Sequence, residues 1–180
     1  MTEVYETDAE LDELQRLLDE SHTRANIHLR AIINDERTLA APEIAGLMTG
    51  MRTLSVATVT AGGEPRISGV DGHLMHARWV FTTAGVATKA VHLRARPGVS
   101  AAYIEGDDVG VYTHGQAEFL TSQHPDFDEI EEHLVRHYGS SPSSWDDDIA
   151  YIRIRPTWMI GYAFKRDELL AERGVPPAPR

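Results

Sequence analysis

The sequence predicts a mainly β protein: a six-stranded antiparallel split barrel with flanking helices and an N-terminal helical extension. Two observations lead to this fold class. From residue 53 onward, short β-branched runs alternate with Gly- and Asp-rich turns, and one short helical segment follows the third run. Strands and helices do not alternate regularly, and no G-x-G-x-x-G follows the first strand, which excludes a doubly wound parallel sheet. Six short antiparallel strands of this kind typically close into a small barrel.

The chain divides into three parts: a helical extension over residues 1–50, the barrel over residues 51–165, and a short turn and tail over residues 166–180. In the extension, apolar residues at Leu11, Leu14, Leu17 and Leu18 follow helical spacing and form a stripe that faces either the core or a partner. Pro42 opens a further short helical segment, which ends before Gly50.

The barrel elements follow in order. Residues 54–60 and 65–74 form a hairpin around a Gly-Gly turn, and Gly69 and Gly72 indicate a bulge or a close approach to the backbone. After a third strand over 79–82, a helix containing Val86, Ala90 and Leu93 ends at Pro97. The remaining elements are strands over 99–104 and 109–120, an amphipathic helix over 127–138, a strand over 149–164 bent at Pro156, and a helical turn over 167–172.

Composition limits the partners and the location. The formal net charge of -11 argues against nonspecific binding to nucleic acid or to an anionic membrane surface. No apolar run approaches the ~20 residues of a membrane-spanning helix, and the acidic N-terminus lacks the features of a signal peptide. The chain has no cysteine, which excludes disulfides and thiolate chemistry. We therefore expect a cytoplasmic protein.

A candidate anion site lies where the third strand leads into the following helix. Thr82 and Thr83 end the strand, and the helix carries Thr88, Lys89 and Arg94. Backbone N–H groups at a helix start, hydroxyls and an ammonium group together suit a phosphate, and no Asp or Glu occurs between Arg78 and Arg96. A solvated surface lysine is an equal alternative for Lys89, and Arg94 either helps to hold the phosphate or caps the helix end.

A second candidate region lies on the first hairpin. Arg52, Thr53 and Ser55 open its first strand, and Ile67, Ser68 and Gly69 lie across from it. A flat ring laid against two strands requires backbone groups and small side chains, which these positions provide. An ordinary half-buried hairpin remains the alternative interpretation.

Other chemistry receives little support. His133 and His137 have the i, i+4 spacing of a helical ligand pair, but no third ligand is placed, so no metal site is expected. His114, on the fifth predicted strand, faces a ligand or packs within the sheet. There is no G-x-S-x-G nucleophile elbow, which leaves no recognisable hydrolase.

The chain resembles the pyridoxamine 5'-phosphate oxidase-like split-barrel family, which includes flavin- and deazaflavin-dependent oxidoreductases. The resemblance rests on the hairpin over 53–70, on Phe81-Thr82-Thr83 with the segment 88–100, and on Gly115-Gln116-Ala117-Glu118. It implies a homodimer with two cofactors at the subunit interface. By position, the phosphate would contact Thr82, Thr83, Thr88 and Lys89, while the ribityl chain and ring would lie along Arg52, Thr53, Leu54, Ser55, Ile67, Ser68 and Gly69. Gln116 would approach from a later strand, either of the same subunit or of the other one.

The chain lacks the Arg-x-Val-Leu-Leu-Lys strand and the Arg-x-His motif of the vitamin-forming oxidase, so we do not expect pyridoxamine phosphate oxidation. The leading expectation is an oxidoreductase that acts on a small organic substrate with FMN, or with the deazaflavin coenzyme F420 as a close alternative. Two other expectations stay open. One is a haem-binding or haem-degrading barrel with His114 or His92 as ligand, and the other is a flavin-binding carrier or sensor without turnover.

Overall fold

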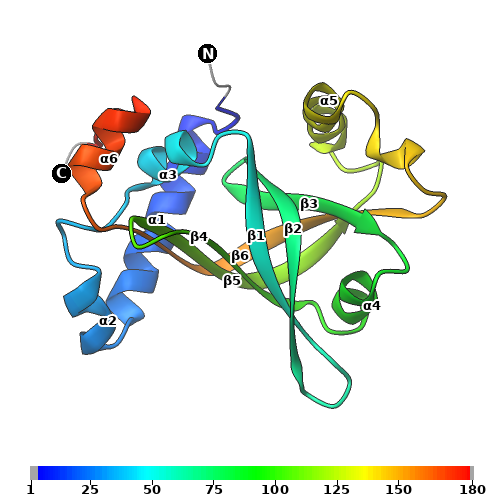
Figure 1. The fold of residues 1–180 in the computed structure, drawn as a ribbon, viewed down its shortest axis with the longest axis horizontal. Helices are drawn as coiled ribbons and strands as arrows, with labels where there is room; N and C mark the ends of the chain where they lie inside the picture. The colour runs from blue at the N-terminus through cyan, green and yellow to red at the C-terminus, as the bar shows by residue number, and fades with distance from the viewer. Residues whose placement is uncertain (1–3, 179–180) are drawn as a thin grey trace.

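The computed structural model describes residues 4–178 and contains a closed six-stranded barrel (Figure 1). The strands are β1 (Met51–Val59), β2 (Pro65–Met75), β3 (Arg78–Ala84), β4 (Gly98–Glu105), β5 (Val109–Leu120) and β6 (Ile149–Ala163). Their order around the barrel is β1-β2-β3-β6-β5-β4, and every neighbouring pair is antiparallel. The predicted fold class is confirmed.

The helices gather on two sides of the barrel (Figure 1). On one side lie α1 (Asp8–Arg24), α2 (Ile27–Ile32), α3 (Ala41–Leu47) and the C-terminal α6 (Arg166–Arg173). On the other side lie α4 (Thr88–Ala95) and α5 (Phe127–Tyr138), with a short 3₁₀ turn, η1 (Pro142–Ser144), after α5. The N-terminal helical extension and the helix after the third strand are therefore present as predicted.

Helix α1 packs its leucine stripe onto the barrel. It begins with a capping box between Thr7 and Glu10, and it buries Leu14, Leu18 and Ser21. The Ser21 hydroxyl accepts a hydrogen bond of 3.0 Å from the backbone N–H of Met159 on β6. The leucine stripe, predicted to face either the core or a partner, therefore faces the core.

Strand alternation divides the barrel wall into an inner and an outer face. On β1, Leu54, Val56 and Thr58 are buried, while Thr53 and Ser55 are exposed. The apolar core fills the barrel and continues beneath α1 and α3. A second cluster lies under α5 and comprises Met75, Val80, Leu120, Ile130, Leu134 and Tyr151.

The irregular point of the sheet is not at Gly69 or Gly72. The β1–β2 register runs unbroken from Met51↔His73 to Val59↔Pro65, so a bulge there is wrong. Gly72 instead admits the Leu54 side chain, because an added Cβ would lie 2.3 Å from Leu54 Cδ1. The register shift occurs between His114 and Gly115 in β5.

At that shift the β6 backbone passes close to β5. A Cβ on Gly115 would lie 2.2 Å from the carbonyl oxygen of Arg155, just before Pro156. The predicted bend of the last strand at Pro156 and the glycine of the Gly115-Gln116-Ala117 segment therefore belong to one local feature of the barrel.

The chain end is tied back to the extension. Arg166, at the start of α6, forms a buried ion pair with Glu43 of α3. The Glu43 carboxylate also accepts a hydrogen bond of 2.8 Å from the N–H of Ala178, and Val175 is buried against Gly46. The described part of the tail thus packs against α3.

Candidate functional site

The corner between β3 and α4 brings a hydroxyl and an ammonium group together. Lys89 Nζ lies 3.4 Å from Thr83 Oγ1 and donates a hydrogen bond to it. Both side chains are half-buried. Successive strand residues point to opposite faces, so Thr82 lies on the other face of β3 from Thr83. Two of the four residues predicted to hold a phosphate are thus in direct contact.

The start of α4 is open for an anion. Its N-cap residue, Ala87, makes no side-chain capping hydrogen bond. The first hydrogen bond within the helix runs from the Val91 N–H to the Ala87 carbonyl, at 3.1 Å. The N–H groups of residues 88–90 therefore have no acceptor within the helix. Thr88 is exposed at this first turn, one residue before Lys89. The partial positive charge of the helix start and the Lys89 ammonium therefore act on the same region.

Arg94 braces this corner from the far end of the helix. Its guanidinium donates to the carbonyl oxygen of Gly85, lies 4.0 Å from the Asp148 carboxylate, and covers the Phe119 ring at 5.0 Å. The Gly85 N–H in turn donates to the Asp148 carbonyl at 2.7 Å. Because these contacts fix the turn between β3 and α4, Arg94 is a positioning residue of the corner.

Helix α4 also connects the corner to β1. His92 Nδ1 lies 3.0 Å from the Thr58 hydroxyl, and Arg96 Nε donates to the carbonyl oxygen of Val59 at 2.9 Å. Figure 1 shows α4 beside the lower part of the β1–β2 hairpin, next to the end of β3. Sequence reasoning treated the phosphate corner and the hairpin as separate groups, and this helix is the element that links them.

On the hairpin, the outward positions form a shallow surface of small groups. Ser55 pairs with Gly69 on β2 and with Ala102 on β4. A Cβ on Gly69 would meet no atom within 4 Å, so the backbone there is open. On this outward face Thr53 is exposed and Ile67 is 75% exposed. Ser68 is half-buried and lies on the inner face of the hairpin, because it pairs with the buried Val56.

Two of the predicted hairpin residues have structural roles in this chain. Leu54 is completely buried in the barrel, so only its backbone is near the outer wall. Arg52 donates to the Leu47 carbonyl at the end of α3, at 2.8 Å, and its guanidinium lies 5.9 Å from the Tyr103 ring centroid. A cation at a helix C-terminus is favourable, which explains this position.

Gln116 lies apart from Lys89 within one copy of the chain. It is half-buried and pairs with Gly98 on β4 and Arg155 on β6. Gly98 follows the C-terminal end of α4, whereas Lys89 is in the first turn. The eight residues of α4 span about 12 Å, at about 1.5 Å per residue.

A buried polar network between β2 and α5 was not among the site residues predicted from the sequence. His73 Nδ1 lies 2.8 Å from His133 Nε2, and His73 Nε2 lies 3.1 Å from the Tyr138 hydroxyl. Burial, together with His133 and His137, lowers the pKa of His73 to about 3. Burial and the Asp71 carboxylate raise the pKa of Tyr138 to about 12. His73 and Tyr138 are therefore both uncharged at neutral pH.

His114 lies on the outer wall of the barrel. Its Nδ1 is 2.8 Å from the Ser100 hydroxyl, and its ring stacks on Trp158 with a centroid distance of 4.7 Å and an interplanar angle of 25°. Two histidines were expected as haem ligands. His92 is hydrogen-bonded through Nδ1 to the Thr58 hydroxyl, whereas His114 is exposed.

Fold and site together define a small closed antiparallel barrel with a lysine and a threonine in contact at the start of one helix. The family model for pyridoxamine 5'-phosphate oxidase matches residues 40–162. The chain therefore belongs to the pyridoxamine 5'-phosphate oxidase-like split-barrel family. No curated protein matches it.

Solved structures share the fold at low sequence identity. A conserved hypothetical protein of Mycobacterium tuberculosis is 20% identical, with a TM-score of 0.62, over 82% of this chain and 95% of that one. An FAD-binding protein of Mesorhizobium loti is 20% identical, with a TM-score of 0.56, over 70% and 94%. The haem storage protein HutZ of Vibrio cholerae is 19% identical, with a TM-score of 0.57, over 69% and 96%. Within residues 4–178, no helix is long and apolar enough to cross a membrane.

Proposed function

We propose that this protein is a flavin-dependent oxidoreductase that uses FMN, with the deazaflavin F420 as the close alternative, to act on a small organic substrate. The observation that carries the proposal is the β3–α4 corner, where Lys89 contacts Thr83 beside a helix start that has no side-chain cap. Hydroxyl, ammonium and backbone N–H groups in one place form the donor set of a phosphate site.

The chain's own residues would bind and orient the cofactor. Lys89, Thr83 and the N–H groups at the start of α4 would hold the phosphate, while Arg94 keeps the turn in place through the Gly85 carbonyl. The open backbone at Gly69 and the small Ser55 side chain leave room for a flat ring on the hairpin. A bound flavin supplies hydride chemistry, and the protein contributes position and electrostatics.

The charge pattern favours FMN over F420. The acidic tail of the deazaflavin requires free cations near the phosphate. Arg94 and Arg96 are the arginines of the α4 segment, and each already donates to a backbone carbonyl, that of Gly85 and that of Val59, respectively. Arg78 lies at the opposite end of β3 and contacts the Glu13 carboxylate. The net charge of -11 disfavours the longer anion further.

We expect a homodimer that places the cofactor between two copies of the chain. The outer wall carries large exposed apolar side chains, with Ile67 75% and Ile104 56% exposed, as expected where a partner packs. Gln116 and Lys89 lie near opposite ends of α4, so one cofactor would contact both most readily if the second copy supplied Gln116. The expected location remains the cytoplasm.

The test compares the only two lysines of the chain, Lys89 and Lys165. FMN and F420 are titrated separately into wild type, Lys89→Ala and Lys165→Ala. Loss of a charge-assisted hydrogen bond corresponds to about 1.5–3 kcal/mol, so Lys89→Ala should weaken binding by about 10- to 150-fold. Lys165 forms an exposed ion pair with Glu168 on α6, far from the corner in sequence, and its removal should leave binding unchanged.

Wild-type affinity of Lys89→Ala for both cofactors would remove Lys89 from the site and the proposal with it. Turnover is a separate readout. Tight flavin binding without reduction of quinone, nitro or enone acceptors would identify a carrier or sensor instead of an enzyme.

Haem binding is the second candidate, and His114 is the observation that favours it. An exposed imidazole held through Nδ1 presents Nε2 outward, which is the arrangement of an axial ligand. A Soret band after haem addition, lost in His114→Ala and kept in His92→Ala, would support it. No such band would leave flavin as the remaining candidate.

A further inference from the structure

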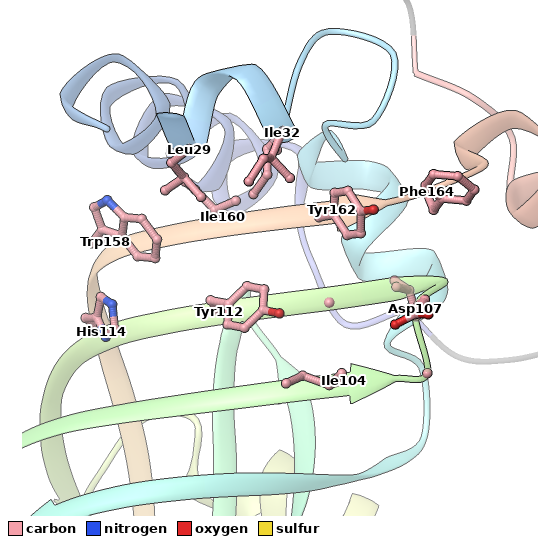
Figure 2. Close-up of a pocket in the computed structure, with 14 residues that line it drawn as sticks. Leu29, Ile32, Ile104, Asp107, Tyr112, His114, Trp158, Ile160, Tyr162 and Phe164 are labelled. Atoms are coloured by element: carbon pink, nitrogen blue, oxygen red, sulfur yellow. The ribbon is translucent and has the colours of Figure 1, made fainter. Parts of the chain in front are cut away.

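An aromatic groove lies on the barrel wall beneath α2, away from the β3–α4 corner (Figure 2). It has a volume of about 680 Å³, within the range of small-molecule sites. Its floor comes from β5 and β6 and its roof from α2. Its aromatic lining residues are Tyr112, His114, Trp158, Tyr162 and Phe164.

The two ends of the groove differ. Figure 2 shows the His114 and Trp158 rings together at one end, with Asp107 and Phe164 at the other. In the roof, Leu29 and Ile32 of α2 point down toward the strands (Figure 2). Helix α2 buries none of its residues, and Ile32 is 40% exposed. The apolar side chains of this helix are therefore available to contact a ligand in the groove.

A glycine shapes the floor. An added Cβ on Gly110 would lie 2.9 Å from Tyr112 Cε2, on the same outward face of β5. The Tyr112 ring therefore lies along the strand over Gly110, in space that a side chain at this position would fill. Any larger residue at position 110 would push that ring away from its place on the floor.

The polar groups of the groove are few and their charge is informative. Among its lining residues, all within the described chain, Asp107 is the one carboxylate, and there is no lysine or arginine. Arg37, beside the groove, is engaged by the Ile32 carbonyl at 3.4 Å and by the Phe164 ring at 4.9 Å, so an anionic ligand would meet the Asp107 charge with no unengaged cation in the lining. At the aromatic end, His114 Nε2 and Trp158 Nε1 have no hydrogen-bond partner within residues 4–178 and are the polar atoms available to a ligand.

We infer that this groove binds an uncharged, planar aromatic molecule, which stacks along Tyr112 and beside the His114–Trp158 pair and receives a hydrogen bond from or gives one to His114 Nε2. The rings offer flat faces, the aliphatic roof adds apolar surface, and a lining without lysine or arginine favours an uncharged ligand.

The groove is close to the hairpin proposed to carry the cofactor ring. In the strand register, Ser55 of β1 lies opposite Ala102 of β4, and Ala102 lies opposite Tyr112 of β5. Two strand spacings of about 4.8 Å separate Ser55 from the groove floor. The identification of the bound molecule as the substrate rests on the proposed function. The binding of such a molecule in the groove does not depend on it.

The experiment uses two probes with the same ring system. N-phenyl-1-naphthylamine is uncharged and fluoresces in apolar surroundings, and 8-anilinonaphthalene-1-sulfonate adds one negative charge to it. Both are titrated into the full-length protein without cofactor. We expect saturable binding at one site per chain, with the uncharged probe bound about tenfold more tightly or better.

Matched variants locate the probe. Ile32→Glu places a charge in the roof, whereas Ile27→Glu makes the same change on the same helix at a residue that is 81% exposed and does not line the groove. Ile32→Glu and Gly110→Ala should each weaken the uncharged probe by about tenfold, and Ile27→Glu should leave it unchanged. Circular dichroism verifies that each variant is folded.

Three results would overturn the inference: no saturable binding to wild type, tighter binding of the sulfonate, or equal effects of Ile27→Glu and Ile32→Glu. If wild type binds no probe and Ile32→Glu alone changes the sedimentation coefficient, a second copy of the chain fills the groove. A failed FMN titration with intact probe binding would refute the proposed function and leave this site standing.

Discussion

Removing Arg166 should destabilise the protein strongly, because it would leave a charge buried without its partner. Arg166 Nε donates to Glu43 Oε2 at 3.0 Å, and a second donor, Nη2, contacts Glu43 Oε1. The Glu43 side chain is 0% exposed and that of Arg166 is 5% exposed. In Arg166→Met the carboxylate would keep only the N–H groups of Ala40 and Ala178 as donors, at 2.9 and 2.8 Å.

Breaking a buried pair in this way typically costs about 3–5 kcal/mol, whereas replacing both partners costs much less. We expect that loss for Arg166→Met, and a smaller one for Arg166→Met combined with Glu43→Gln, which removes the charge but keeps the shape. Urea unfolding followed by circular dichroism measures both, with the m value as the check on two-state behaviour. A loss below about 1 kcal/mol for the single variant, or a fully additive double variant, would refute the argument.

Three further predictions concern other parts of the barrel. Gly115→Ala should lower the free energy of unfolding by about 1–3 kcal/mol, since its Cβ would lie 2.2 Å from the Arg155 carbonyl oxygen, and denaturant unfolding with Gly69→Ala as the open-site control measures this. His73 has a folded-state pKa of about 3 against a usual 6.5, so its contribution is present above pH 6.5 and is lost as the pH falls toward 3. His73→Gln should therefore flatten the fall in stability over that range, and an unchanged pH profile would contradict the role of this ring. Thr83→Val removes the hydroxyl that contacts Lys89 and should weaken FMN binding by about 0.5–1.5 kcal/mol in the same titration as Lys89→Ala, with no effect counting against the corner.

Local patterns were sufficient to predict the elements of this fold. The leucine spacing of α1, the Gly-Gly hairpin and the single helix after the third strand all appear where the sequence placed them. These signals depend on neighbours within a few residues, so they can be read without the tertiary structure. Of the two alternatives for Gly69 and Gly72, the bulge was wrong and the close approach is confirmed at Gly72, but a glycine pattern does not reveal which group approaches. Gly72 admits Leu54, and Gly115 admits the β6 backbone.

The cofactor site stays a prediction: the sequence indicated which residues to consider, but not the contacts that its arginines make in the folded chain. Lys89 beside Thr83 agrees with the phosphate-site reasoning. Arg52 was expected along the cofactor, and Arg94 either at the phosphate or as a cap of the helix end. Each donates to a backbone carbonyl that only the folded chain brings near. The contact between His73 and His133 is equally invisible in the sequence, because 60 positions separate the two rings.

The continuous circle of strands also restricts how two copies of the chain can associate. Every strand has hydrogen-bonded neighbours on both sides, but β2 pairs with β3 only over residues 73–75, so a second molecule could add a strand only where an edge such as residues 65–72 is free. A dimer formed elsewhere uses side chains on the curved exterior, and substituting those side chains leaves the main-chain ladder intact. Charged replacements at Ile67 or Ile104 should therefore give well-folded single subunits, which makes the contribution of the second copy separable from the stability of the first.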